Sequence, residues 1–341
     1  PLVKAGDQFI RLREVGIGGL QLSGDELVKR LQLVHGDHFD QGPGDGRESS
    51  EFDLASDVAV GQRYLPFGVP VIDQAMIDEV TDTLRSGWIG MGRKTQRFER
   101  QFAEYTGAGN AVAVSSCTAA LHLSLCSQGI GPGDEVITTP MTFAATIGAI
   151  LQSGAKPVLA DIDPVTLNIS PAAMRQKLSN RTRALLPVHF GGLPCDMKAI
   201  DQLADEFKLT VVEDAAHAVG ARYDGQPVGN RSNVACFSFY ANKNMTTAEG
   251  GMMTTADGDL AARLRVMRLH GLEGHAWKRY LSKEISYSHV VMPGYKYNMT
   301  DLQASLGIHQ LKRLDEWQNT REVFAALYDQ ALSHLPGIQL Q

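Results

Sequence analysis

One lysine stands in a setting that could make its amine reactive. Lys243 lies in the stretch FYANKNMTTAEGG (239–251), after an apolar run and before a Glu-Gly-Gly turn. A lysine that leaves a buried strand through a polar loop is partly desolvated, which lowers its pKa and makes it a better nucleophile. Most lysines are solvated charges, so Lys243 alone does not decide between the two interpretations.

Two further polar features follow runs that look like strands. Asp214 ends the apolar run LTVVED (209–214), and Cys117 and Thr118 follow the run AVAVS (111–115). A helix that starts after a strand presents free N–H groups and the positive end of its dipole, which suit a phosphate. The ordinary alternatives are that Asp214 caps the next turn and that Cys117-Thr118 simply begins a helix.

The combination is more specific than its members. An anion site, an aspartate and a lysine follow one another along the chain, each after a strand of one predicted sheet. Pyridoxal phosphate requires an anion site, a carboxylate that keeps its ring nitrogen protonated, and a lysine that binds it covalently. The sequence therefore predicts a pyridoxal phosphate site built on Cys117, Thr118, Asp214 and Lys243.

Alternating strand and helix patterns would position these residues. The predicted strands are AVAVS (111–115), EVITT (135–139), KPVLAD (156–161), RALLPVHF (183–190), LTVVED (209–214), VACFSF (234–239) and GMMTT (251–255). Helical patterns lie between several of them, at 118–128, 142–153, 171–179 and 196–207. This alternation predicts an α/β fold with a mostly parallel sheet, helices on both faces, and ligands at the carboxyl ends of the strands.

Composition excludes several other classes of function. The 341 residues are 43% hydrophobic and carry a formal net charge of −6, and no Lys/Arg block stands out. Binding to nucleic acid or to an anionic membrane therefore has no electrostatic support. No apolar run reaches the roughly 18 residues of a membrane span. The four cysteines lack CxxC spacing, so we expect reduced thiols in a cytoplasmic protein and no metal site.

The N-terminal part has a different pattern. The run FIRLREV (9–15) alternates like a strand, and Ser23 with Glu26 has the spacing of a capping box that opens a short helix. Residues 41–57, QGPGDGRESSEFDLASD, are rich in Gly, Ser and acidic residues and predict a linker. Because about 40 residues can hardly fold alone, we expect the first piece to be the end of a larger domain.

Longer motifs resemble a known family. They are WIGMGRKTQRFERQFAEYTGAGNAVAVSSCTAALHL (88–123), GIGPGDEVITTPMTFAAT (129–146), PVHFGGLPCDM (187–197), VVEDAAHAVGA (211–221), FSFYANKNMTTAEGG (237–251) and PGYKYNMTDLQASLG (293–307). These motifs resemble the DegT-type sugar aminotransferases of fold-type I, most closely the branch that makes UDP-4-amino-4-deoxy-L-arabinose. The resemblance runs from about Leu65 to the end of the chain.

The resemblance implies a domain organisation. Residues 1–40 weakly resemble the C-terminal end of a formyltransferase, and residues 41–63 would be the linker. Residues 64–310 would form the large domain that binds pyridoxal phosphate, and residues 311–341 would begin a small C-terminal domain. Since members of the family continue beyond the position of Gln341, we expect this small domain to be incomplete here.

The resemblance also assigns roles to matching residues. Lys243 would hold the cofactor covalently and move the proton, and Asp214 would pair with the pyridine nitrogen. The other matches are Cys117, Thr118 and Ser238 for the phosphate, Phe143 for stacking on the ring, His217 near the phenolic oxygen, and Asn298 or Lys296 for the phosphate of a neighbouring subunit. This chain departs from the family's pattern where Cys117 replaces a frequent Gly and where Lys-Tyr-Asn (296–298) replaces a frequent Asn-Tyr-Arg.

Two further residues have both a substrate-binding and a structural interpretation. Trp88 begins the loop WIGMG, which in the family lies near the sugar-nucleotide site, but it could equally anchor packing. His189 falls at the end of a predicted strand, where it could contact substrate or could simply be a hydrogen-bonded edge histidine.

The implied activity is a ping-pong transfer of an amino group from glutamate to a nucleotide-linked keto-sugar. A UDP-4-keto sugar is the expected acceptor, and cell-surface polysaccharide, lipopolysaccharide or lipid A modification the expected context. The family implies a homodimer with shared active sites. Two alternatives stay open. One is a sugar dehydratase of the same family, whose members usually replace the lysine; the other is an inactive or cofactor-binding-only scaffold, because the C-terminal part is missing.

Overall fold

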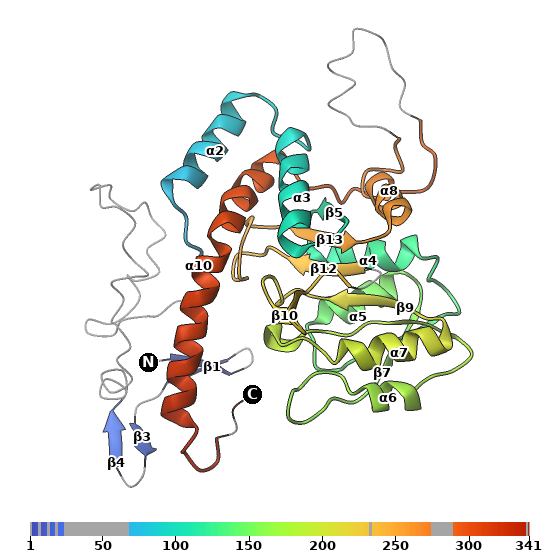
Figure 1. Ribbon diagram of the computed structural model, residues 1–341. Coiled ribbons are helices and arrows are strands. Elements are labelled where there is room, and N and C mark those ends of the chain that lie inside the picture. Colours follow the sequence, from blue (N-terminus) through green and yellow to red (C-terminus); the bar gives the residue numbers. More distant parts are fainter. Residues whose placement is uncertain are drawn as a thin grey trace. The chain divides into compact units, whose positions relative to one another are not determined.

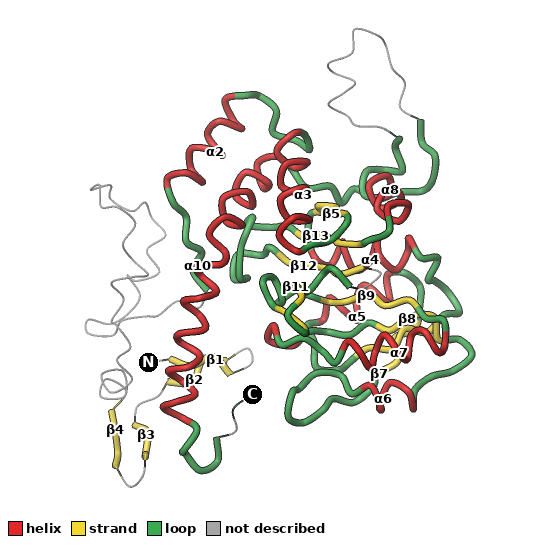
Figure 2. Tube along the Cα trace, viewed as in Figure 1, coloured by secondary structure: helices red, strands yellow, loops and turns green. Residues whose placement is uncertain are grey.

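The computed structural model describes residues 68–231, 234–273 and 289–338, with Leu340 and the backbone of four short strands near the N-terminus (Figures 1 and 2). These strands are β1 (Leu2–Ala5), β2 (Gln8–Arg11), β3 (Glu14–Ile17) and β4 (Leu20–Ser23). They form two antiparallel pairs, β1 with β2 and β3 with β4, so the alternating run at 9–15 is divided between two strands. The helix predicted after Ser23 and the linker predicted at 41–57 lie outside the described residues.

The chain divides into two compact units. Residues 74–315 form one unit, which contains the main sheet; residues 1–73 and 316–341 form the other. Helix α10 (Asp301–Leu332) begins in the first unit and continues into the second.

A sheet of seven strands forms the centre of the larger unit (Figure 2). Its strands are β5 (Asn110–Val114), β13 (Gly251–Thr255), β12 (Val234–Ser238), β9 (Thr210–Asp214), β8 (Thr182–Leu185), β6 (Glu135–Thr138) and β7 (Lys156–Leu159), in that spatial order. Six strands run in one direction, and β13 runs antiparallel to both of its neighbours. The predicted, mostly parallel sheet is therefore confirmed.

Helices connect and cover these strands (Figure 1). They are α2 (Gln74–Arg85), α3 (Arg93–Thr106), α4 (Cys117–Ser127), α5 (Ala144–Gln152), α6 (Pro171–Gln176), α7 (Met197–Phe207) and α8 (Gly258–Met267). A short 3₁₀ turn (Phe190–Gly192) and the small hairpin β10 (Arg222–Tyr223) and β11 (Gln226–Pro227) complete the connections. The four predicted helices correspond to α4 through α7, with ends that differ by no more than three residues.

Alternating side chains pack on the two faces of the sheet. On β5, Val112 and Val114 belong to the core that contains α4, whereas Ala111 and Ala113 belong to the core on the other face. That second core includes Phe98, Phe102, Phe237 and Phe239, whose ring centroids lie 5.1 to 6.1 Å apart in the four contacting pairs. Since successive side chains of a strand point to opposite faces, a strand buried on both faces is apolar on both, as residues 111–114 of β5 are.

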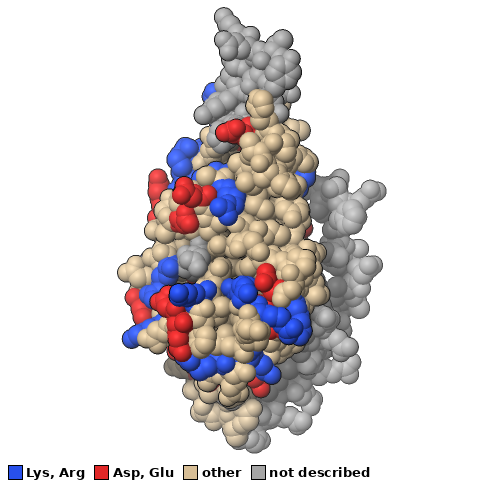
Figure 3. All heavy atoms as spheres, turned by 90° about the vertical axis from the view of Figure 1, so that its right-hand side faces the viewer, with Lys and Arg blue, Asp and Glu red and all other residues tan. Residues whose placement is uncertain are grey.

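Charged side chains of both signs lie side by side over much of the molecular face in Figure 3. On this face the described residues form no continuous surface of one sign. The distribution agrees with the composition, which gave no support for binding to nucleic acid.

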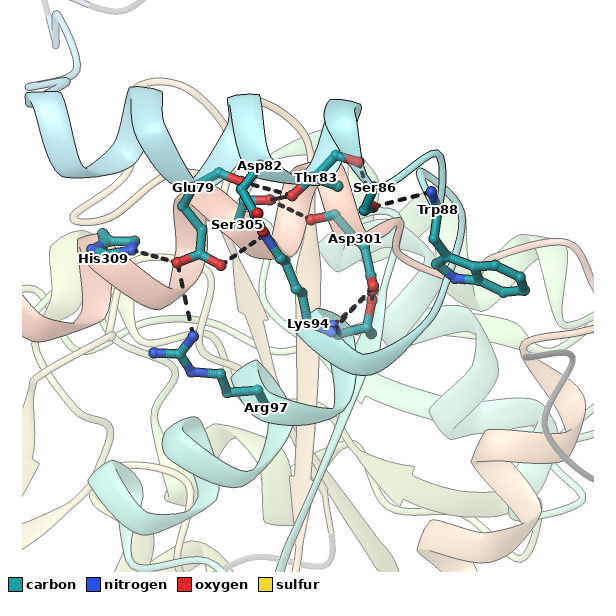
Figure 4. A network of polar contacts seen from close by, with 11 residues as sticks. Glu79, Asp82, Thr83, Ser86, Trp88, Lys94, Arg97, Asp301, Ser305 and His309 are labelled. Atoms are coloured by element: carbon teal, nitrogen blue, oxygen red, sulfur yellow. Dashed lines mark hydrogen bonds and ion pairs between the residues drawn. The ribbon is translucent and has the colours of Figure 1, made fainter. Parts of the chain in front are cut away.

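A remote aspartate caps helix α3 (Figure 4). The N-cap residue of this helix is Gly92, which has no side chain to offer. Asp301 at the start of α10 takes that role: it accepts hydrogen bonds from the N–H groups of Gly92 and Thr95, at 2.8 and 2.9 Å, and from the N–H of Lys94 at 3.1 Å. These bonds satisfy first-turn donors that would otherwise lack partners, and they fasten the loop before α3 to α10.

Candidate active site

The carboxyl ends of the parallel strands bring the predicted cofactor residues to one edge of the sheet. Helix α4 begins immediately after β5, with Ser116 as its N-cap; the Ser116 hydroxyl accepts a hydrogen bond from the Ala119 N–H at 3.1 Å. Within the described residues, the N–H groups of Cys117 and Thr118 have no hydrogen-bond acceptor. This helix start therefore offers free donors of the kind that bind a phosphate.

Gly251 lets another strand approach this helix start closely. A Cβ atom added at Gly251 would lie 2.5 Å from the carbonyl carbon of Ser116 and 2.6 Å from the backbone nitrogen of Cys117. Only glycine fits such a separation without backbone movement. Gly251 also pairs in register with Ser238, so the Ser238 residue ends its strand beside the same helix start. The phosphate-binding residues expected from the sequence are thus brought together.

Cys117 does not fill the anion site. Its side chain is 9% exposed, and the thiol donates a hydrogen bond to the carbonyl oxygen of Cys236 at 3.5 Å, inside the protein. Burial, followed by the charge of Asp214, raises the pKa of the Cys117 thiol well above its ordinary value. The side chain that replaces the frequent glycine therefore stays neutral and points inward, leaving the backbone N–H groups available.

Asp214 is the last residue of β9, and each of its two carboxylate oxygens accepts one hydrogen bond. Oδ1 accepts a hydrogen bond from the Ala216 N–H at 3.1 Å, and Oδ2 accepts one from the Thr146 hydroxyl at 2.7 Å. A carboxylate has about four lone-pair sites, so about two remain for a donor such as a protonated ring nitrogen. Thr146 was not predicted from the sequence.

Lys243 lies in the loop after β12, in a partly buried position. Its backbone N–H donates to the Tyr240 carbonyl at 3.0 Å, whereas its Nζ forms no hydrogen bond or ion pair with any described residue. Burial lowers the pKa of Lys243, and the nearby Cys117 and Asp214 offset part of this effect. The amine is therefore neutral at a lower pH than a solvated lysine, as a nucleophile or base requires.

Two ring-bearing side chains lie near these groups. Phe143 is the N-cap residue of α5 and is 80% exposed, so its ring offers a free apolar face three residues before Thr146. His217 lies close enough to Lys243 and Asp214 to interact with both electrostatically. Burial, and then the charge of Lys243, lowers the pKa of His217, which favours the neutral imidazole.

The segment that carries Lys296 and Asn298 pairs with the end of β5. Asn298 bridges Val114, and the Tyr297 carbonyl accepts from the Ser115 N–H at 2.7 Å. Lys296 Nζ donates to Asn298 Oδ1 at 2.6 Å. Both residues are therefore held close to the start of α4 of their own chain.

Trp88 and His189, which had both a substrate-binding and a structural interpretation, have different contacts. Trp88 Nε1 donates to the Met91 carbonyl at 3.2 Å, within the loop between α2 and α3. His189 is fully buried; its Nδ1 accepts from the Cys195 N–H at 3.1 Å and its Nε2 lies 2.7 Å from Glu213 Oε2. With both ring nitrogens occupied by protein groups, the geometry favours the structural interpretation of His189.

Comparison with known proteins assigns the chain to a family. Residues 70–341 match the DegT/DnrJ/EryC1/StrS aminotransferase family. The chain belongs to this family. It is 52% identical over 275 residues to the spore coat polysaccharide biosynthesis protein SpsC of Bacillus subtilis, a match that covers 81% of this chain and 71% of SpsC. It is thus an aminotransferase, which confirms the class of enzyme predicted from the motifs.

Solved structures support the fold and the cofactor. The PLP form of Spr1654 from Streptococcus pneumoniae superposes with a TM-score of 0.74 at 36% identity, covering 80% of this chain and 72% of that one. Helicobacter pylori PseC, an aminotransferase involved in the biosynthesis of pseudoaminic acid, superposes with a TM-score of 0.74 at 30% identity, covering 80% and 72%. Fold-type I and pyridoxal phosphate, both predicted from the sequence, are confirmed, and the anion site, Asp214 and Lys243 suit this cofactor.

None of the helices in the described part of the chain is both long enough and apolar enough to cross a membrane.

Proposed function

We propose that this family member transfers an amino group from glutamate to a nucleotide-linked keto-sugar, with the cofactor held between Lys243 and Asp214. The observation that carries the proposal is the common location of three features. They are a partly buried lysine whose amine has no partner among the described residues, a carboxylate whose oxygens each accept one hydrogen bond there, and a helix start whose first N–H groups are unpaired in the same part of the chain; all three lie at one edge of the sheet. When bound, pyridoxal phosphate supplies a ring that delocalises the charge left on carbon after proton removal.

Lys243 performs the covalent binding and the proton transfer. Its amine would hold the cofactor covalently. Once free, the neutral Nζ would act as the base that takes the proton from the donor's α-carbon and as the acid that gives it back. The lowered pKa of Lys243 would serve both roles, because each requires a neutral amine.

The other residues of the site would bind and orient the cofactor. The Asp214 carboxylate would accept a hydrogen bond from the protonated ring nitrogen and stabilise its positive charge. The N–H groups of Cys117 and Thr118 and the Ser238 hydroxyl would bind the phosphate. Phe143 would stack on the ring, and neutral His217 would interact with the phenolic oxygen.

The proposed acceptor follows from relatives and motifs. SpsC acts in spore coat polysaccharide biosynthesis and PseC in pseudoaminic acid biosynthesis, which supports a sugar acceptor and a role in cell-surface polysaccharide. The motif resemblance favours a UDP-4-keto sugar, with lipid A modification as the alternative context. The presence of Lys243 disfavours the dehydratase alternative, whose members usually lack this lysine.

We further propose a cytoplasmic homodimer in which Asn298 or Lys296 contacts the cofactor phosphate of the partner subunit. All four cysteines are free thiols, which suits a reducing compartment. We propose residues 64–310 as the cofactor-binding domain and 311–341 as the start of a small domain. The remaining assignments, 1–40 as the end of a formyltransferase-like domain and 41–63 as a linker, rest on the sequence alone.

The experiment is a pair of half-reactions followed by absorbance. Glutamate should convert the bound cofactor to its amine form and release 2-oxoglutarate. A panel of UDP-, dTDP- and GDP-linked 4-keto sugars should then restore the original spectrum, with the UDP-linked sugar fastest. Lys243→Ala serves as the inactive control. Restoration by 2-oxo acids but by none of the sugars would contradict the proposed acceptor, and conversion by other amino acids but not by glutamate would contradict the proposed donor.

A further inference from the structure

We propose that Thr146 is a positioning residue: its hydroxyl fixes the Asp214 carboxylate in the orientation that the ring nitrogen of the cofactor requires. This inference rests on the proposed role of Asp214 and extends it to a residue that does not itself touch the cofactor.

The first support is the direction of the Thr146 hydroxyl. A threonine within a helix commonly donates its hydroxyl to the carbonyl oxygen of the preceding turn. Thr146, in the first turn of α5, instead donates to Asp214 Oδ2 at 2.7 Å, on a strand 68 residues away along the chain. Thr146 is fully buried, so this bond is not exchanged with water.

The second support is a chain of hydrogen bonds that runs through the hydroxyl groups of Thr142 and Thr146. The hydroxyl oxygens of Thr142 and Thr146 lie 2.6 Å apart. A hydroxyl has one proton to donate, and that of Thr146 is used on Asp214. Thr142 must therefore donate to Thr146, which makes Thr146 a better donor in turn because successive hydrogen bonds polarise one another. The chain ends on the carboxylate.

The third support is the arrangement around the carboxylate. Ala216 N–H holds Oδ1 from the turn after β9, and Thr146 holds Oδ2 from α5. Two donors on two different oxygens prevent the carboxylate from rotating about its Cβ–Cγ bond, and the remaining lone pairs keep a fixed direction.

Helix α5 therefore carries two residues with proposed roles, Phe143 and Thr146. Phe143 is its N-cap residue and is 80% exposed, and Thr146, in its first turn, is fully buried. The ring that would cover the cofactor and the hydroxyl that orients the partner of its nitrogen are thus set by one rigid element. A shift of α5 would move both together.

The test measures cofactor binding to the full chain. Thr146→Val keeps the shape of the side chain but removes its hydroxyl, whereas Thr146→Ser retains the hydroxyl. Thr106→Val is the matched control, because Thr106 is also a buried helical threonine but donates to the Phe102 carbonyl, four residues back. Asp214→Asn tests the carboxylate that accepts the hydrogen bond from Thr146. Readouts are the Kd of pyridoxal phosphate, by titration of cofactor-free protein, and the pH dependence of the visible absorption band.

Thr146→Val should raise the Kd by about ten- to a hundredfold, the worth of one hydrogen bond to a charged group. It should also shift the pH dependence of the band in the same direction as Asp214→Asn. Thr146→Ser should recover most of the affinity, and Thr106→Val should lower stability alone. If Thr146→Val does not fold, Thr142→Val, which removes only the outer hydroxyl, should show a smaller loss of the same kind.

Two results would overturn the proposal. Wild-type affinity and pH dependence in the threonine variants, with a clear loss in Asp214→Asn, would leave Asp214 in its role and reject Thr146 as its positioning residue. Wild-type behaviour in Asp214→Asn as well would reject the proposed role of Asp214 together with the inference built on it.

Discussion

Lys243 differs from a surface lysine in what surrounds its amine. The side chain is partly buried and forms no ion pair with a described residue, while Asp214 and Cys117 lie close enough to interact electrostatically. Because desolvation is the largest influence, the pKa of Lys243 is lowered despite the neighbouring carboxylate. The same burial that destabilises the charged amine prepares the neutral amine for chemistry.

This burial predicts a pH-dependent stability of the cofactor-free protein. The folded state binds the Lys243 proton less tightly than the unfolded state, so Lys243 penalises folding increasingly as pH falls from about 10 toward neutrality. The Lys243→Met variant should therefore be more stable than the wild type near neutral pH, and the difference should shrink toward pH 10. Urea unfolding at several pH values measures this difference.

Lys177→Met, at the exposed C-cap of α6, is the control for loss of a lysine. It should alter stability little at any pH, as exposed substitutions usually do. A stabilisation by Lys243→Met that grew with rising pH would have the wrong sign and would contradict the account of a desolvated amine.

The location of a side chain could be predicted from the sequence where the chemical group and its strand are close together in the chain. Asp214 ends β9, and the Cys117-Thr118 pair and Lys243 lie within five residues after β5 and β12, so the sheet edge they share could be predicted. Thr146 could not be found in this way. A threonine in a helix carries no local signal, and its partner Asp214 is brought to it only by the fold.

At the scale of elements, the close packing of β13 on the start of α4 shapes the anion site. Gly251→Ala would place a methyl group within 2.6 Å of the backbone at Ser116 and Cys117. The backbone would have to separate, at a cost of about 1–3 kcal/mol, as overpacking commonly causes. We expect lower stability by urea unfolding and a higher Kd for pyridoxal phosphate.

Gly258→Ala provides a matched control. A Cβ at Gly258 meets nothing within 4 Å, and the residue begins helix α8. Alanine there should be neutral or stabilising by up to about 1 kcal/mol, since it lowers the entropy of the unfolded chain. Equal effects of the two substitutions on cofactor affinity would show that the Gly251 contact does not shape the site.

The strands and the helices between them were predictable because their signals are local. Short β-branched runs and the helical patterns between them gave β5 through β9, β12, β13 and α4 through α7. The cap of α3 was not predictable, because Asp301 is 209 residues from Gly92 and nothing in the sequence near Gly92 points to it. Long-range polar contacts of this kind depend on the tertiary fold.

At the scale of the whole molecule, the proposed homodimer makes a prediction about mixed subunits. Lys243→Ala and Asn298→Asp should each inactivate their homodimers, if Asn298 serves the partner's site. Heterodimers formed by refolding the two variants together would contain one intact site, so an equal mixture should recover about a quarter of wild-type activity for a two-fold symmetric dimer. Light scattering measures the oligomeric state of each preparation.

The position of Asn298 makes this experiment informative. Its backbone pairs with Val114, next to the start of α4 in its own chain. No recovery in the mixture, with dimers present and each variant inactive alone, would show that Asn298 serves its own subunit's site. A monomeric, fully active wild type would contradict the shared site altogether.

The covalent role of Lys243 can be tested by identifying the residue that binds the cofactor. Protein loaded with pyridoxal phosphate is reduced with borohydride, digested and mapped by mass spectrometry. We expect a single modified lysine, Lys243, in the peptide that contains FYANKNMTTAEGG, and no modification there in Lys243→Ala. A label on another lysine, or the absence of any stable label on the wild type, would contradict this role.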